Sequence, residues 1–114
     1  MNLRGSNAED KAAAFLQQHG LVVLERNYRC RFGEIDLIAR DENTLVFVEV
    51  RMRASDRFGG AAASITAAKR RKISRTARHY LSGTSRPPAC RFDALLINGV
   101  SHTMEWLKNA FDEE

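Results

Sequence analysis

Two runs of alternating side chains, on either side of a short polar turn, constrain the fold more than any other feature of this 114-residue chain. The two faces of the first run hold Ile35, Leu37 and Ala39 on one side and Glu34, Asp36 and Ile38 on the other. The two faces of the second run hold Val46, Val48, Val50 and Met52 on one side and Leu45, Phe47, Glu49, Arg51 and Arg53 on the other. A period of two is typical of β-strands, so both runs are predicted to be strands.

The turn between the runs fixes how the two strands pair. Residues 41–44 are turn formers between two β-rich runs, and they predict a tight hairpin. The resulting register places Asp36 opposite Glu49 and Glu34 opposite Arg51. A bulge of one residue would separate these pairs, so the prediction depends on a regular ladder.

Two carboxylates that face each other across a hairpin need a positive charge or a proton between them. Like charges directly opposite one another destabilise a sheet. Asp36 and Glu49 share their expected face with Ile38 and Phe47, so burial would increase the repulsion. A divalent cation, Mg²⁺ or Mn²⁺, is the simplest compensation because hard cations take carboxylate oxygens. The carbonyl of Val50 could complete the coordination of this metal.

The same spacing of acids suits phosphodiester chemistry. A bound metal can activate a water and stabilise charge on phosphate oxygens. Arg51 lies two residues beyond Glu49 on the same face and would position the water or the scissile phosphate. Its guanidinium stays protonated, so it cannot act as a general base. A plain ion pair between Glu34 and Arg51, beside a protonated Asp36, is the structural alternative.

Composition and charge narrow the class of protein. Hydrophobic residues at 44% and charged residues at 28% are ordinary globular values, and the length fits one domain over residues 1–114. We find no signal peptide and no run of about 18 apolar residues, which argues against secretion and membrane insertion. Cys30 and Cys90 are expected to be reduced, in or near the core of a cytoplasmic protein. The net charge of +4 favours a polyanionic partner.

The first helix is predicted over residues 7–19. Ser6 and Glu9 fit a capping box, in which each side chain bonds the other residue's backbone. Glu9 also lies at the N-terminal end of the apolar stripe of this helix, where it could reach the same site as Asp36 and Glu49. Spacing alone favours the cap.

The second helix is predicted over residues 66–82, with its cap at Ser64 or Thr66. A solvated helix face usually mixes charges of both signs, but residues 64–86 hold seven basic residues and no acidic one. A surface that faces phosphates is therefore favoured over a merely soluble basic helix. The seven are Lys69, Arg70, Arg71, Lys72, Arg75, Arg78 and Arg86.

Lys69 differs from the other basic residues because its register points inward. Ile65 and Ile73 stand four residues before and after it, on the apolar stripe of the helix. Its aliphatic stem can therefore pack while its ammonium reaches an anion or a carboxylate.

Shorter segments complete the chain. Further strands are predicted over residues 21–25, 90–97 and 103–107. Residues 54–63 are expected to form a loop of small residues, and the tail over 109–114 is expected to fray.

A known family resembles this chain in its most specific stretch. The run from Asn27 to Arg40, NYRCRFGEIDLIAR, is similar to the YraN-like family of small bacterial proteins, as are residues 45–53 and the pair Phe92-Asp93. The resemblance implies a restriction-endonuclease-like fold of the PD-(D/E)xK superfamily, with an αβββαβ core and a mixed central sheet flanked by helices. It also implies similarity to archaeal Holliday junction resolvases, which are dimers that cut branched DNA.

The resemblance further implies which residues form the site. Glu9 is similar to the helix-borne acid of the superfamily, which reverses the preference for a cap. Asp36 and Glu49 are similar to its metal-binding acids. Arg51 takes the position that lysine usually holds, and Ile35 stands where a proline often precedes the first of these strand acids.

We therefore expect a metal-dependent endonuclease that acts on structured or branched DNA with Mg²⁺ or Mn²⁺. The alternative is a non-catalytic nucleic-acid-binding module that keeps the fold, and a third reading is a structural partner of another protein. By the resemblance a homodimer is expected, with apolar contact from residues 45–50 or from the Trp106 end. The residues expected to contact the nucleic-acid backbone are Arg53, Lys69, Arg70, Arg71, Lys72 and Arg75.

Overall fold

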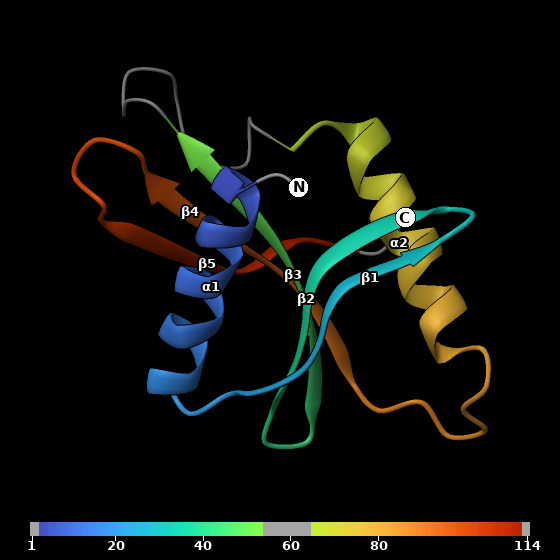
Figure 1. The fold of residues 1–114 in the computed structure, drawn as a ribbon. Helices are drawn as coiled ribbons and strands as arrows, with labels where there is room; N and C mark the ends of the chain where they lie inside the picture. Colours follow the sequence, from blue (N-terminus) through green and yellow to red (C-terminus); the bar gives the residue numbers. More distant parts are fainter. Residues whose placement is uncertain (1–2, 54–64, 113–114) are drawn as a thin grey trace.

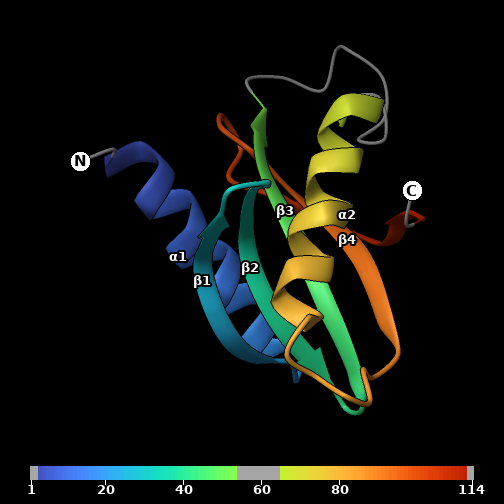
Figure 2. The ribbon, with the colours of Figure 1, turned by 90° about the vertical axis from the view of Figure 1, so that its right-hand side faces the viewer.

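The computed structural model describes residues 3–53 and 65–112 and contains a five-stranded mixed sheet between two helices. The strands lie in the sheet in chain order, antiparallel except for the parallel pair β3 and β4, which α2 connects. The two helices cover opposite faces of the sheet (Figure 1, Figure 2). This confirms the αβββαβ order. The elements are α1 (Leu3–Gln18), β1 (Val22–Cys30), β2 (Gly33–Asp41), β3 (Thr44–Arg53), α2 (Ala67–Leu81), β4 (Cys90–Asn98) and β5 (Met104–Phe111).

The hairpin of β2 and β3 has the register that the turn predicts as far as Leu37, but the ladder ends before the expected pair of Glu34 with Arg51, and Glu34 pairs with Arg29 instead. The ladder runs from Asp41 opposite Thr44 to Leu37 opposite Val48. The alternation of side chains places β3 between two apolar layers, because Val46 and Val48 face α1 while Phe47 faces α2.

Ile35 departs from the predicted alternation. It was expected on the face of Leu37 and Ala39, but it packs in the α2-side cluster with Ile38 and Phe47. The alternation therefore breaks between Ile35 and Leu37, beside the last pair of the β2–β3 ladder. Asp36 lies at this break.

Gly33 gives the physical reason for the break. Its φ is +152°, and a Cβ at this position would lie 3.1 Å from the hydroxyl oxygen of Thr76 in α2. The missing side chain lets the closed end of the β1–β2 hairpin pack directly on α2, as Figure 1 shows. The start of β2 thus packs against α2, while the rest of the strand pairs with β3.

The helix ends were predicted with mixed success. Thr66 caps α2, and its hydroxyl accepts a hydrogen bond from the backbone N–H of Lys69 at 3.1 Å. The capping box at Ser6 is wrong, because α1 already begins at Leu3 and a cap residue must lie outside the helix. Ser64 lies outside the described residues.

Two strands are longer than predicted. β1 continues to Cys30 because pairing with β2 holds its exposed second half, which lacks an apolar pattern. β5 continues to Phe111. The expectation that the chain frays from Asn109 onward is therefore wrong for residues 109–111. Phe111 is buried and stacks on Phe92 with ring centroids 5.0 Å apart.

The structure also bears on the predictions for the cysteines, the dimer contact, membrane insertion and the loop after β3. Cys30 is half-buried but Cys90 is exposed, so the expectation of a position in or near the core is wrong for Cys90; neither forms a disulfide. Leu45 to Val48 are buried in a central strand and cannot supply a dimer contact. Neither α1 nor α2, the helices of the described ranges, is long and apolar enough to cross a membrane. The loop over 54–63 lies outside the described residues.

The buried carboxylate of Asp93 joins β4 to β5. Its oxygens accept hydrogen bonds from Arg91 Nε at 3.1 and 3.2 Å, from Trp106 Nε1 at 2.9 Å and from the backbone N–H of Asn109 at 3.0 Å. Arg91 also forms an ion pair with Asp41 at 3.0 Å. Asp93 is fully buried and its oxygens are satisfied, which makes it a structural acid.

Replacing Asp93→Ala should therefore destabilise the protein strongly. The change removes the acceptor of an indole N–H and a backbone N–H and leaves the half-buried Arg91 with Asp41 as its remaining carboxylate. Breaking a buried charged pair costs roughly 3–5 kcal/mol. Urea unfolding measures this loss. Asp10→Ala, which removes an exposed partner of Arg26, is the control and should cost about 1 kcal/mol or less. Equal losses in the two variants would contradict the structural role of Asp93.

Candidate functional site

The candidate site lies where β2 and β3 stop pairing. The backbone N–H of Val50 donates a hydrogen bond to Asp36 Oδ2 at 2.8 Å, so a side chain takes the place of a ladder partner. The carboxyl group of Asp36 is also hydrogen-bonded to that of Glu49. The two acids predicted to face each other are therefore in direct contact.

Two more carboxylates approach Asp36 from other elements. Glu9 comes from α1 and Glu34 from the start of β2, and one carboxylate oxygen of each lies within 4.8 Å of the others and of an oxygen of Asp36. Ala13 and Leu16, which follow Glu9 along α1, are buried against the sheet and hold the helix in place. The structure thus brings Glu9, Asp36 and Glu49 to one place.

Burial and mutual repulsion change the acidity of these groups. Burial is the largest cause that raises the pKa of Asp36 to about 8, and the hydrogen bond and charge of Glu49 add to it, while the Val50 N–H and Lys69 oppose it. Burial also raises the pKa of Glu9; a hydrogen bond from Asn27 lowers it, and the charges of Asp36 and Glu34 raise it. Without a cation, the carboxyl group of Asp36 therefore keeps its proton at neutral pH.

The basic residues around the acids take different positions. Lys69 Nζ lies 3.4 Å from Glu49 Oε2, so its ammonium reaches a carboxylate, as its inward register indicates. Arg29 Nε pairs with Glu34 Oε2 at 2.9 Å. Arg51 is half-buried and lies two residues after Glu49 on β3, hence on the same face.

The donor set fits a hard divalent cation. The four carboxylates offer oxygen atoms only, which Mg²⁺ and Mn²⁺ prefer. Glu49 Oε2 is buried and accepts no hydrogen bond among the described residues, so a metal bound there would compete only with its ion pair to Lys69. The carbonyl of Val50 projects to the same side of β3 as its N–H, which is the side of Asp36.

The basic block of α2 divides into two groups. Arg71, Lys72 and Arg75 are exposed along the helix. Arg70 Nε donates a hydrogen bond to the carbonyl of Ile65 at 3.1 Å, so this side chain folds back on the start of the helix. The side chain of Arg53 lies outside the described part of the chain.

Sequence reasoning missed two residues of this site, Asn27 and Glu34. Asn27 interrupts the extended backbone of β1 with a φ of +53°, and its side chain bonds Glu9. For Glu34 the signal was its position two residues before Asp36. For Asn27 no signal existed until the pairing of β1 with β2 was known, because that pairing places it opposite Asp36.

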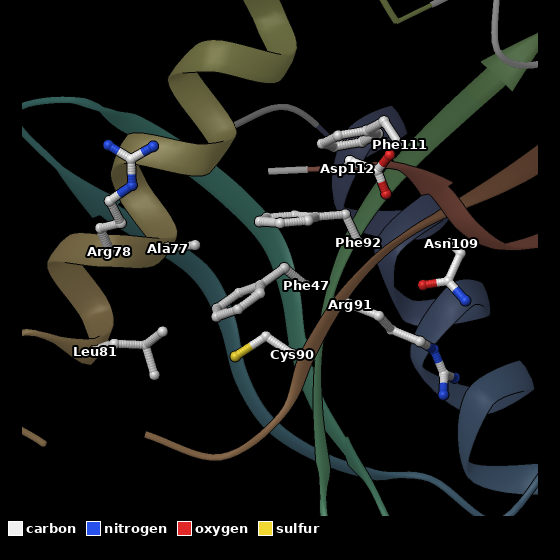
Figure 3. A pocket seen from close by; sticks show the side chains of 10 residues that line it. All are labelled: Phe47, Ala77, Arg78, Leu81, Cys90, Arg91, Phe92, Asn109, Phe111 and Asp112. Atoms are coloured by element: carbon white, nitrogen blue, oxygen red, sulfur yellow. The ribbon is translucent and has the colours of Figure 1, made fainter. Parts of the chain in front are cut away.

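A pocket between α2 and the end of the sheet is separate from the acids. Figure 3 shows the rings of Phe47, Phe92 and Phe111 inside it, with the guanidinium groups of Arg78 and Arg91 pointing away from each other. None of the four carboxylates lines it. The candidate site therefore does not depend on this pocket.

Comparison with known proteins defines the class of this chain. The family model described as "Uncharacterised protein family UPF0102" matches residues 8–97. A UPF0102 protein of Nitrosomonas europaea is 67% identical over 96% of this chain and 94% of its own length. One of Nitrosospira multiformis is 58% identical over 98% and 95%, and one of Psychromonas ingrahamii is 52% identical over 98% and 92%. The chain belongs to the UPF0102 family, the YraN-like family of small bacterial proteins.

The proton on the carboxyl group of Asp36 gives a testable dependence of stability on pH. The folded-state pKa of Asp36, about 8, lies above the ordinary value of 3.8, so the folded protein holds a proton that the unfolded chain releases. This stabilisation is full below the ordinary value and is lost as the pH rises through the folded value. The free energy of unfolding without metal should fall by up to roughly 1.4 kcal/mol per pH unit in between.

Urea unfolding in EDTA, between about pH 5 and pH 8, measures this slope. Asp36→Asn cannot ionise and should flatten it, whereas Asp10→Asn, which changes an exposed acid, should leave it unchanged. A wild-type slope that Asp36→Asn does not reduce would mean that Asp36 does not hold the proton.

Proposed function

We propose that the protein is a divalent-metal-dependent endonuclease that hydrolyses phosphodiester bonds in nucleic acid. The observation that carries this proposal is the contact between Asp36 and Glu49, with Glu9 and Glu34 close by. Acids that repel one another persist in a fold only where other interactions compensate. A divalent cation would relieve the repulsion and serve phosphoryl chemistry at once.

The residues of the site have distinct roles in this proposal. Asp36, Glu49 and the carbonyl of Val50 would hold Mg²⁺ or Mn²⁺, and Glu9 would support them through its hydrogen bond with Asn27. When bound, the metal supplies an activated water and charge stabilisation at the phosphate. Arg51 would hold the scissile phosphate as a fixed cation, since its guanidinium cannot accept a proton.

The exposed basic residues of α2 support a nucleic-acid substrate. Arg71, Lys72 and Arg75 project from the helix that also brings Lys69 to Glu49. Phosphates bound along this helix would therefore lead to the acids. The similarity to junction resolvases implies that the substrate is structured or branched DNA. It also implies that the protein acts as a homodimer. The αβββαβ order supports the wider restriction-endonuclease-like relationship.

Cleavage should need the metal and both strand acids. We expect wild-type protein to cut at least one substrate in a panel of duplex, junction, flap and single-stranded DNA and RNA with Mn²⁺, and none with EDTA. Asp36→Asn and Glu49→Gln keep the shape of each side chain and should lower the rate by about 100-fold or more, the loss expected for one positioned electrostatic group. Glu42→Gln, in the β2–β3 turn, is the matched control and should cut normally. If wild-type protein leaves every substrate of the panel uncut in the presence of Mn²⁺, or if Asp36→Asn cuts at the wild-type rate, this site is not a nuclease site.

A binding module without turnover is the second candidate, and Arg51 is the observation that favours it. A lysine at this position could exchange a proton, whereas arginine can only position or attract. In this case binding would weaken steeply with salt and with Lys72→Glu but not with Asp36→Asn, and no substrate would be cut.

A further inference from the structure

A cluster of rings and cations lies where the turn between β1 and β2 meets the last turns of α2. Phe32 in this turn contacts His79 of α2 with ring centroids 5.9 Å apart, and Tyr28 of β1 lies 6.5 Å from the same histidine. The guanidinium carbon of Arg31 stands 4.8 Å from the centroid of the Phe32 ring. Gly33 fixes the contact, because its missing side chain lets this turn rest on α2.

The cluster is open to solvent and lies in a basic environment. Arg31 and His79 are exposed, and Phe32 is half-buried. On α2, Lys72 and Arg75 precede His79 by seven and four residues and therefore share its face. The helix contains no acid, and the acid whose charge acts on Tyr28 and Tyr80 is Glu25 of β1.

This chemistry suits an unpaired nucleobase. A cationic plane backed by an aromatic ring offers a flat surface on which a base can stack, and neighbouring cations hold the phosphates on either side. Bases inside a duplex already stack on their neighbours and cannot use such a surface. A basic surface alone, in contrast, binds single strands and duplexes by charge.

The position of the cluster connects it to the acids. Phe32 precedes Glu34 by two residues and Asp36 by four, so the Cα atoms of Phe32 and Asp36 can be no more than roughly 14 Å apart. A base stacked on the cluster would therefore belong to a nucleotide close to the phosphate at the acids.

We propose that Arg31, Phe32 and His79 form a stacking platform for an unpaired base, so that the preferred ligand is nucleic acid with a single-stranded segment. This inference rests on the proposed function for its link to cleavage, but the platform itself requires neither metal nor turnover.

Equilibrium binding in EDTA tests the platform without the metal site. The probes are a short fluorescein-labelled single-stranded DNA, the same sequence as RNA, and its blunt duplex, followed by fluorescence anisotropy. Wild type should prefer the single strands, and the two single-stranded probes distinguish DNA from RNA. Phe32→Ala should weaken single-strand binding by about 5- to 100-fold, the effect of removing one stacking ring. It should leave duplex binding unchanged.

Two conservative variants separate stacking from folding and from charge. Phe32→Tyr keeps a ring and should restore single-strand binding, which a general loss of structure in Phe32→Ala would not explain. Arg31→Lys keeps the charge but removes the plane, so it should weaken single-strand binding, whereas Arg40→Lys at an exposed site on β2 should have no effect. Equal single-strand affinities of wild type, Phe32→Ala and Arg31→Lys, or equal wild-type affinities for single strand and duplex, would overturn the platform.

The outcomes also separate this inference from the nuclease proposal. A single-strand preference that depends on Phe32, in a protein that cuts nothing, supports the platform and rejects the nuclease. If the protein cuts with Mn²⁺ but Phe32→Ala binds single strands as tightly as wild type, the platform is rejected and the nuclease is supported.

Discussion

The hydrogen bond from the Val50 N–H to the carboxylate of Asp36 is the contact on which the candidate site depends. The N–H of a residue within a sheet needs an acceptor, and beyond the pair of Leu37 and Val48 the acceptor is this side chain and no longer the backbone of β2. The contact ties Asp36 to the strand that carries Glu49, so the two acids meet although β2 turns away. Their mutual repulsion is the cost of this arrangement, and a proton or a metal offsets it.

The helices complete the site from opposite faces of the sheet. From one face, α1 brings Glu9 within 4.8 Å of the Asp36 carboxylate, held by the buried apolar stripe of the helix. From the other face, α2 brings Lys69 to within 3.4 Å of Glu49. The same packing that lets Gly33 approach α2 also places Phe32 against His79. One hairpin end thus determines both the break in β2 and the ring cluster.

Whether a feature of the fold or of the site could be predicted from the sequence depends on how far apart in the chain the interacting residues are. The register of β2 against β3 as far as Leu37 and Val48 depends on a turn and on local alternation, so the sequence predicts it, and the contact of Asp36 with Glu49 comes directly after this last pair. The reversal at Ile35 and the role of Asn27 depend on β1 and α2 packing against the start of β2, contacts between segments distant in the chain. Local periodicity carries no information about such contacts. Glu9 is an intermediate case. The sequence predicts that it lies at the end of the apolar stripe of the first helix, but helix periodicity does not decide whether it caps the helix or joins the site.

Binding of Mn²⁺ to metal-free protein, followed by electron paramagnetic resonance at a pH near 8, tests the central claim most directly, because the acids are then free to release their proton. The account predicts saturable binding by wild type and by Asp10→Asn, and loss of that binding in both Asp36→Asn and Glu49→Gln. Absence of binding by wild type, or binding that persists unchanged in these two variants, would contradict it.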